Sequence, residues 1–155
     1  MAYVTGLELT AYATARGITL IGDPDVLVTR AHDYVDNSRF IGAKTDPLQA
    51  NEWPRSDAYF NGVLIVDTVI PDYSGGGSVI KMELETAISI DQGNDPLVLV
   101  DNSVKKTFKK VDVIETETEY VDQGRENAIS PAITRAAGGL IDSSNNGISF
   151  TVVNA

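Results

Sequence analysis

Four short stretches of the sequence contain residue types that could do chemistry. The first holds His32, the only histidine, with Asp33 and Asp36 close behind it, a set that could form a general base or part of a metal site. On a helix, Asp33 would face away from His32, and Asp36 would lie one turn on and form at most a surface ion pair. We therefore favour a structural role for His32 over a catalytic or metal-binding one.

Two further stretches resemble known sites only loosely. The run SGGGS at 74–78 is rich in glycine, but no Lys-Ser or Lys-Thr follows at the spacing of a P-loop, so a flexible hinge is the favoured interpretation. Glu115, Glu117 and Glu119 alternate along one face of a predicted strand, where consecutive carboxylates normally point into water. Neither stretch predicts phosphate binding or acid–base catalysis.

The fourth stretch, VKKTFKKVD, places four lysines around one aromatic residue, Phe108. Such a ring among lysines can be a stacking platform for single-stranded nucleic acid. Lysines on an edge strand also protect against aggregation, and this is the favoured interpretation. The chain as a whole has a net charge of −10, so its overall field repels phosphate backbones.

Composition excludes several classes of protein. Cysteine is absent, which rules out disulfides, thiol catalysis and cysteine-ligated metals. No apolar run is long enough to cross a bilayer, and the N-terminus lacks the pattern of a secretion signal, so we expect no membrane partner. With no catalytic constellation in view, we expect a protein that is not an enzyme and needs no metal or cofactor. Its 155 residues allow one domain with a modest core.

The elements that would position these residues are mainly helical. A capping box at Thr5 predicts a helix running to Gly17, and a cap followed by proline predicts a second helix from Pro24 to near Ser38. Apolar residues at helical spacing predict a third helix over 79–90. Turn residues interrupt 39–78, which also holds enough apolar side chains to predict a long packed loop.

The remainder of the chain alternates between apolar and polar residues. Residues 104–121 read as a β segment without an Asn-Gly or Asp-Gly turn. A tight hairpin is therefore not predicted, and pairing with a strand from elsewhere, including another subunit, is the alternative. A short helix over 130–138 and a C-terminal tail follow. The predicted fold class is mainly α: a small helical bundle (1–92) with a long packed loop, and an extension (93–155) with a β-strand segment.

One part of the chain resembles a known family. Residues 29–59 are similar to the pattern of tailed-bacteriophage head–tail connector proteins, also called adaptor or head-completion proteins. That pattern is a helix ending in Tyr-(Ile/Val)-Asp, then Phe-x-Gly-x-(Arg/Lys)-Thr, then Gln-x-x-x-Trp-Pro-Arg, the last matched by Gln49, Trp53, Pro54 and Arg55. Similar stretches follow in order as far as Ser130–Ile133, so the resemblance covers nearly the whole chain. Members of this family also carry the label DnaT-like single-stranded-DNA-binding protein.

The sequence departs from the family pattern in two places. The run at 74–78 lengthens the approach to the third helix, and Ala136 to Gly139 replace a bulkier, leucine-rich end. The second departure leaves the register of the last helix open.

The resemblance implies a structural virion protein that forms a ring, typically of twelve copies, between the portal and a tail or stopper (head-closure) protein. Double-stranded DNA would pass through the ring, which would sit at the portal vertex after assembly in the host cytoplasm. The strand proposed to face neighbouring subunits or DNA contains Lys105, Lys106, Phe108, Lys109, Lys110, Ile114 and Tyr120. The terminal segment would dock on the portal, with the candidates Pro131, Ile133, Leu140, Ile141, Ile148, Phe150 and Val152. The alternative function is that of a single-stranded-DNA-binding accessory protein.

The stretch around Trp53, the only tryptophan, has two possible roles. Pro54 biases Trp53 to an extended conformation, so we expect the indole to close the core over the second and third helices. Arg55 would then hydrogen-bond loop carbonyls or Asp57, with Tyr59 helping to pack the loop. The alternative is an interface anchor, since tryptophan and arginine are favoured at binding hot spots.

Overall fold

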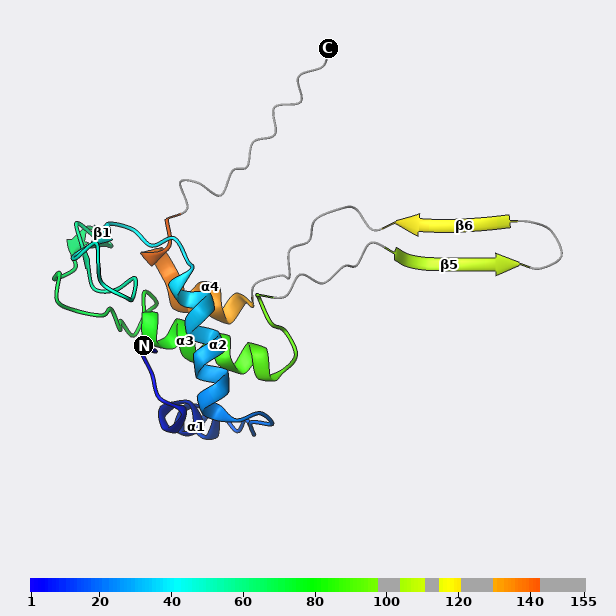
Figure 1. Ribbon diagram of the computed structural model, residues 1–155, viewed down its shortest axis with the longest axis horizontal. Helices are drawn as coiled ribbons and strands as arrows, with labels where there is room; N and C mark the ends of the chain where they lie inside the picture. Colours follow the sequence, from blue (N-terminus) through cyan, green and yellow to red (C-terminus); the bar gives the residue numbers. More distant parts are fainter. Residues whose placement is uncertain (98–103, 111–114, 121–129, 143–155) are drawn as a thin grey trace, which may run out of the picture.

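In the computed structural model, four α-helices pack into one body with a long loop at one end (Figure 1). The structure describes residues 1–97, 104–110, 115–120 and 130–142, and these four helices are counted within those ranges. Together with three two-stranded antiparallel sheets, they confirm a mainly α fold with minor β structure. None of the described helices has the length and apolar character needed to span a membrane.

The first two helices begin where their capping residues predict. Helix α1 (Gly6–Ala15) opens with the complete capping box, in which the Glu8 amide donates to the Thr5 hydroxyl and the Thr5 amide donates to the Glu8 carboxylate. Helix α2 (Pro24–Asp36) begins with Asp23, whose carboxylate accepts from the amides of Asp25 and Val26. Proline is tolerated at the first helical position, because the N–H group that it lacks would have no partner within the helix there.

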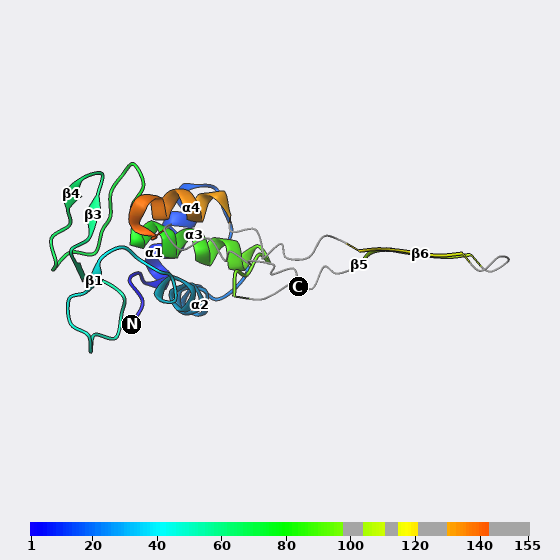
Figure 2. The same cartoon turned by 90° about the horizontal axis from the view of Figure 1, so that it is seen from above.

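Helix α3 (Val79–Asp91) is the centre of the body. Figure 2 shows it between α2 and α4, and α1 also contacts it. It is therefore buried on more than the one stripe that a surface helix presents. Its buried positions include polar residues as well as apolar ones: Val79, Met82, Glu83, Leu84, Thr86, Ala87, Ile88, Ser89 and Ile90.

The last helix belongs to the same body. Helix α4 (Pro131–Ala137) begins at the predicted Ser130 cap and runs into the short 3₁₀ helix η1 (Gly138–Leu140). Ile133, Ala136, Ala137 and Leu140 are buried in one cluster with side chains of α3 and the long loop. The sequence assigns this helix to an extension, but its apolar face packs on α3 and completes the core, so the helical body includes residues 130–142.

The long loop is built from two small hairpins. Strand β1 (Ala43–Lys44) pairs with β2 (Arg55–Ser56), and β3 (Tyr59–Phe60) pairs with β4 (Val63–Leu64). In the second hairpin the turn residues Asn61 and Gly62 both have positive φ, as a type I′ turn requires. Buried side chains of the loop, among them Trp53, Ala58 and Ile65, pack it as predicted.

The second half of the glycine run, Gly76 to Ser78, is packed, so the hinge interpretation is wrong for these residues, whereas Ser74 and Gly75 are exposed. The amides of Gly77 and Ser78 both donate to the Ala136 carbonyl, at 2.9 and 2.8 Å. A Cβ at Gly77 would lie 2.5 Å from the Phe60 ring, so only glycine allows this approach. The run therefore joins the loop to α4 by close backbone contact.

The β segment pairs with itself. Strands β5 (Val104–Lys110) and β6 (Glu115–Tyr120) pair with each other, antiparallel, instead of with a strand from elsewhere. A tight Asn-Gly turn is not required, since hairpins also form with connections of about four or five residues. Figures 1 and 2 show this pair, here called the ribbon, standing apart from the helices.

Candidate interaction sites

Trp53 lies in the core. Its side chain is 2% exposed and meets the Phe40 ring edge to face, with the ring centres 5.7 Å apart. The Trp53–Pro54 peptide bond is cis. This placement fits the core-closing role, because a buried indole is not available to a partner unless the loop opens. Tyr59 differs, as more than half of its surface is exposed.

Arg55 holds the loop together from the inside. Its guanidinium donates to the carbonyls of Ile41 at 2.8 Å, Gly42 at 2.7 Å and Phe40 at 3.3 Å. It also forms an ion pair with Glu52, whose other oxygen is 2.8 Å from the Lys44 ammonium. Hydrogen bonds to loop carbonyls were expected, but the carboxylate partner is Glu52 and not Asp57. The planar fork of arginine suits this arrangement, since it satisfies several acceptors at once.

A polar network lies under the same loop. Tyr3 donates its hydroxyl to Asp36 at 3.0 Å and accepts from the Trp53 amide at 3.0 Å, while Asp36 also accepts from the Glu52 amide. His32 stands edge-on to the Tyr3 ring. Asp36 is therefore part of a network between α2, the N-terminal segment and the loop. Its second oxygen lies 4.0 Å from Nε2 of His32, so the contact one turn along the helix is present as predicted, but both side chains are partly buried and Asp36 has further partners.

Glu83 is the buried end of this network. Its side chain is fully buried, and one carboxylate oxygen accepts from the Tyr3 amide at 2.9 Å. The other oxygen faces Nδ1 of His32 at 3.5 Å, and neither of these two atoms has a further partner among the described residues. Burial raises the pKa of Glu83 to about 8, and burial lowers the pKa of His32. A protonated Glu83 can then donate to the neutral imidazole of His32.

Sequence reasoning missed Glu83, although a signal was present. The predicted stripe of the third helix includes Ile80, Leu84 and Ala87, and Glu83 lies three residues after the first and four before the last. A charged residue inside an apolar stripe is the pattern expected of a buried polar group. Within the part of the chain that the structure describes, no group of three or more histidine and carboxylate side chains is arranged to hold a metal ion.

The ribbon brings lysines and glutamates into register. Lys106 pairs with Glu119, Phe108 with Glu117 and Lys110 with Glu115. Directly opposed residues of an antiparallel pair lie on the same face, so each of these glutamates shares a face with its partner. Only Lys106 and Lys110 of the four lysines of β5 stand opposite glutamates, because Lys109 pairs with Thr116 and Lys105 lies at an irregularity of the register. Tyr120 pairs with Val104, and Ile114 lies outside the described residues.

The docking candidates of the C-terminal segment differ in how far they are buried. Ile133 and Leu140 are at most 1% exposed and belong to the core, whereas Pro131 is exposed. Ile141 is half-buried and forms a backbone bridge with Phe40. The side chains of Ile133 and Leu140 thus hold α4 on the body. The remaining candidates, Ile148, Phe150 and Val152, lie outside the described residues.

A group of exposed apolar side chains lies on the loop instead. We call it the loop patch; each member is at least 36% exposed, and its residues are Tyr59, Val63, Leu64, Val66, Val69, Ile70 and Tyr73. Tyr59 and Leu64 are direct cross-strand partners in the β3–β4 hairpin. Figure 2 shows this hairpin and the ribbon at opposite ends of the helical body. As cross-strand partners, Tyr59 and Leu64 share one face of this hairpin, while Val63, which pairs with Phe60, lies on the other face.

Comparison with known proteins gives one family. The model of the family described as "Putative DnaT-like ssDNA binding protein" matches residues 2–155. No curated protein and no solved structure matches the chain significantly. Since the match covers nearly every residue, the chain belongs to this DnaT-like family.

Proposed function

We propose that this chain is a structural assembly protein, a head–tail adaptor that forms a ring between the portal and the tail or stopper protein of a bacteriophage. The observation that carries the proposal is the exposure of the apolar side chains of the loop patch, of which Tyr59 and Leu64 are direct neighbours, on a protein with a net charge of −10. Apolar contact between copies would bury this surface. A strongly acidic exterior would limit adhesion of the DNA that passes through the ring.

The arrangement of the two ends supports an assembly role. The loop patch is at one end of the helical body, and the ribbon is at the other (Figure 2). A ring member needs separate surfaces for its neighbours and for the components above and below it, because a heterologous contact joins two different patches. Many modest contacts of this kind add up through multivalency.

Leu64→Asp tests the loop patch. We expect purified wild-type protein to form a ring, visible by electron microscopy and as a large species in light scattering at high concentration. Leu64→Asp should remain monomeric, since it places a charge in the proposed contact. The matched control is Leu7→Asp, which changes another exposed leucine at the start of α1. A wild-type protein that stays monomeric at high concentration, or that is missing from the portal vertex of finished virions, contradicts the proposal.

A second function, single-stranded-DNA binding, is favoured by the description of the family and by the four lysines of β5. The register weakens the electrostatic argument for it, because the glutamates of β6 lie opposite two of those lysines. Titration of the protein with a labelled oligonucleotide at two salt concentrations separates the two functions. If the ribbon binds DNA, affinity falls as salt rises, and Lys109→Gln weakens binding while Arg39→Gln does not.

A further inference from the structure

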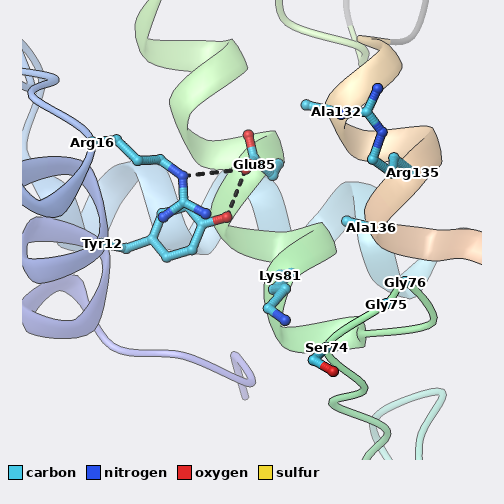
Figure 3. Close-up of a pocket in the computed structure, with 10 residues that line it drawn as sticks. All are labelled: Tyr12, Arg16, Ser74, Gly75, Gly76, Lys81, Glu85, Ala132, Arg135 and Ala136. Atoms are coloured by element: carbon cyan, nitrogen blue, oxygen red, sulfur yellow. Dashed lines mark hydrogen bonds and ion pairs between the residues drawn. The ribbon is translucent and has the colours of Figure 1, made fainter.

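A pocket of about 400 Å³ opens where α1, α3, α4 and the glycine run meet (Figure 3). Three cationic side chains line it from three different places: Arg16 directly after α1, Lys81 on α3 and Arg135 on α4. Glu85 is the only carboxylate among its lining residues. The lining is therefore positive, against the net charge of −10 of the whole chain.

Glu85 fixes one of the cations in place. It accepts a hydrogen bond from the Tyr12 hydroxyl at 2.6 Å and lies 3.9 Å from Nε of Arg16 (Figure 3). The guanidinium carbon of Arg16 lies 3.4 Å from the centre of the Tyr12 ring. Tyr12 and Glu85 thus hold the Arg16 guanidinium at the pocket wall by stacking and by charge.

The other two cations are less engaged. The Lys81 ammonium has only long contacts, 3.5 Å to the Tyr73 carbonyl and 4.0 Å to Asp72. The Arg135 guanidinium makes no hydrogen bond or ion pair with any residue that the structure describes, and it is exposed. Both side chains can therefore donate to a ligand without first losing a strong partner.

The glycine run adds backbone donors at the rim. Gly76 has φ of 109°, and a Cβ there would lie 2.9 Å from the Arg135 carbonyl oxygen, so glycine is required for this approach. Within the described ranges, the amides of Gly75 and Gly76 and the hydroxyl of Ser74 donate to no protein acceptor. Successive free amides beside cations form the kind of concavity that binds oxyanions.

We propose that this pocket binds a phosphate group carried by a nucleotide, either free or within a single DNA strand. The cations line different walls of the pocket, with Lys81 near the glycine run and Arg135 on α4 (Figure 3), so the lining favours an anionic ligand with several charged oxygens over a neutral one. The pocket is larger than a phosphate alone needs, and Ala132 and Ala136 give it a small apolar wall for a sugar or base. With a DNA strand as ligand, this binding site rests on the second proposed function, single-stranded-DNA binding, and it does not depend on the assembly role.

The test is an NMR titration of the ¹⁵N-labelled full chain with thymidine monophosphate, with inorganic phosphate and with a short oligo(dT). We expect saturable shifts centred on the amides of Gly75 and Gly76. Arg135→Gln and, separately, Lys81→Gln should each weaken affinity about tenfold, the effect of losing one charge-assisted hydrogen bond. The matched control is Arg39→Gln, which removes the same charge from an exposed arginine outside the pocket.

The separate titrations distinguish a DNA strand from a free nucleotide as the ligand, and a nucleotide from an acidic peptide. If oligo(dT) binds more tightly than the mononucleotide and Arg135→Gln weakens both, the site holds a phosphate of a DNA strand. Equal affinities identify a free nucleotide. The proposal fails if neither nucleotide saturates, if Arg39→Gln weakens binding as much as Arg135→Gln, or if a polyglutamate peptide shifts the same amides when the nucleotides do not. None of these outcomes alters the expected oligomeric state of Leu64→Asp.

Discussion

Replacing Glu83 with glutamine should make the stability of the protein less dependent on pH. Burial raises the pKa of Glu83 to about 8, from a value of 4.5 for an exposed glutamate. Between these two values the folded chain holds a proton that the unfolded chain has released. The free energy of unfolding therefore decreases as pH rises through this window, and the stabilisation is complete only below the unfolded value.

The expected size of the effect follows from the same two values. The pKa of His32 is lowered in the folded chain, while about half of the unfolded chains carry a protonated His32 at pH 6.5, so the contribution of His32 to the pH dependence near this pH has the opposite sign to that of Glu83. The groups facing Glu83 are then His32 and Asp36 from α2 and Tyr3 with the terminal amine from the N-terminal segment. From pH 6.5 to 8.5, ionisation of Glu83 should lower the free energy of unfolding by about 2 kcal/mol.

Urea unfolding followed by circular dichroism at several pH values measures this change. Glu83→Gln keeps a neutral side chain of the same shape that can donate to His32, so its stability should stay nearly constant over the same range. Subtracting the two curves cancels His32 and every other shared group. Asp67→Asn, which changes an exposed carboxylate on the loop, should follow the wild type. Parallel curves for wild type and Glu83→Gln would refute the assignment of a neutral, buried Glu83.

Three further predictions concern the loop. Trp53→Ala should lower the free energy of unfolding by about 3–5 kcal/mol, because the substitution leaves a cavity beside Phe40. Urea unfolding of the monomer measures this loss. A folded, equally stable variant that no longer assembles would instead assign Trp53 to an interface. Arg55→Lys should cost about 1–3 kcal/mol, since one ammonium cannot reach the carbonyls of Phe40, Ile41 and Gly42 together, and a thermal melt that is unchanged would contradict this. Gly77 and Gly62 both have positive φ, but only an alanine at position 77 would place a Cβ against the Phe60 ring. The melting temperature should therefore fall further for Gly77→Ala than for Gly62→Ala. Equal decreases in melting temperature would show that the packing at Gly77 is not tight.

The parts of the fold governed by local rules were predictable from the sequence. Caps at Thr5, Asp23 and Ser130 predicted where three helices begin, because these side chains satisfy free amides without help from the rest of the chain. The Asn61-Gly62 pair is an equally local signal for a hairpin, and it forms the turn between β3 and β4.

Long-range pairing was not predictable in the same way. Whether the glycine run is a hinge or a contact depends on Phe60 and α4, which local composition does not reveal. The burial of α4 likewise depends on partners distant in the sequence, whereas β5 and β6 are neighbours that pair without an Asn-Gly or Asp-Gly signal between them. For the candidate sites, the core role of Trp53 and the carbonyl contacts of Arg55 were anticipated, while Glu83 and the pocket around Arg135 were not. Both of the latter join residues from several elements.

The antiparallel packing of α3 and α4 has a consequence for how this chain can vary. The end of α3 and the start of α4 lie at the same end of the body (Figure 2), so everything encoded between residues 92 and 130 leaves and returns at one place. Such a segment can be lengthened, shortened or exchanged for another without changing the helices on either side. The helical body can thus accept different inserted segments between α3 and α4. A chimera that carries a foreign hairpin at this position should melt at nearly the same temperature as the parent protein.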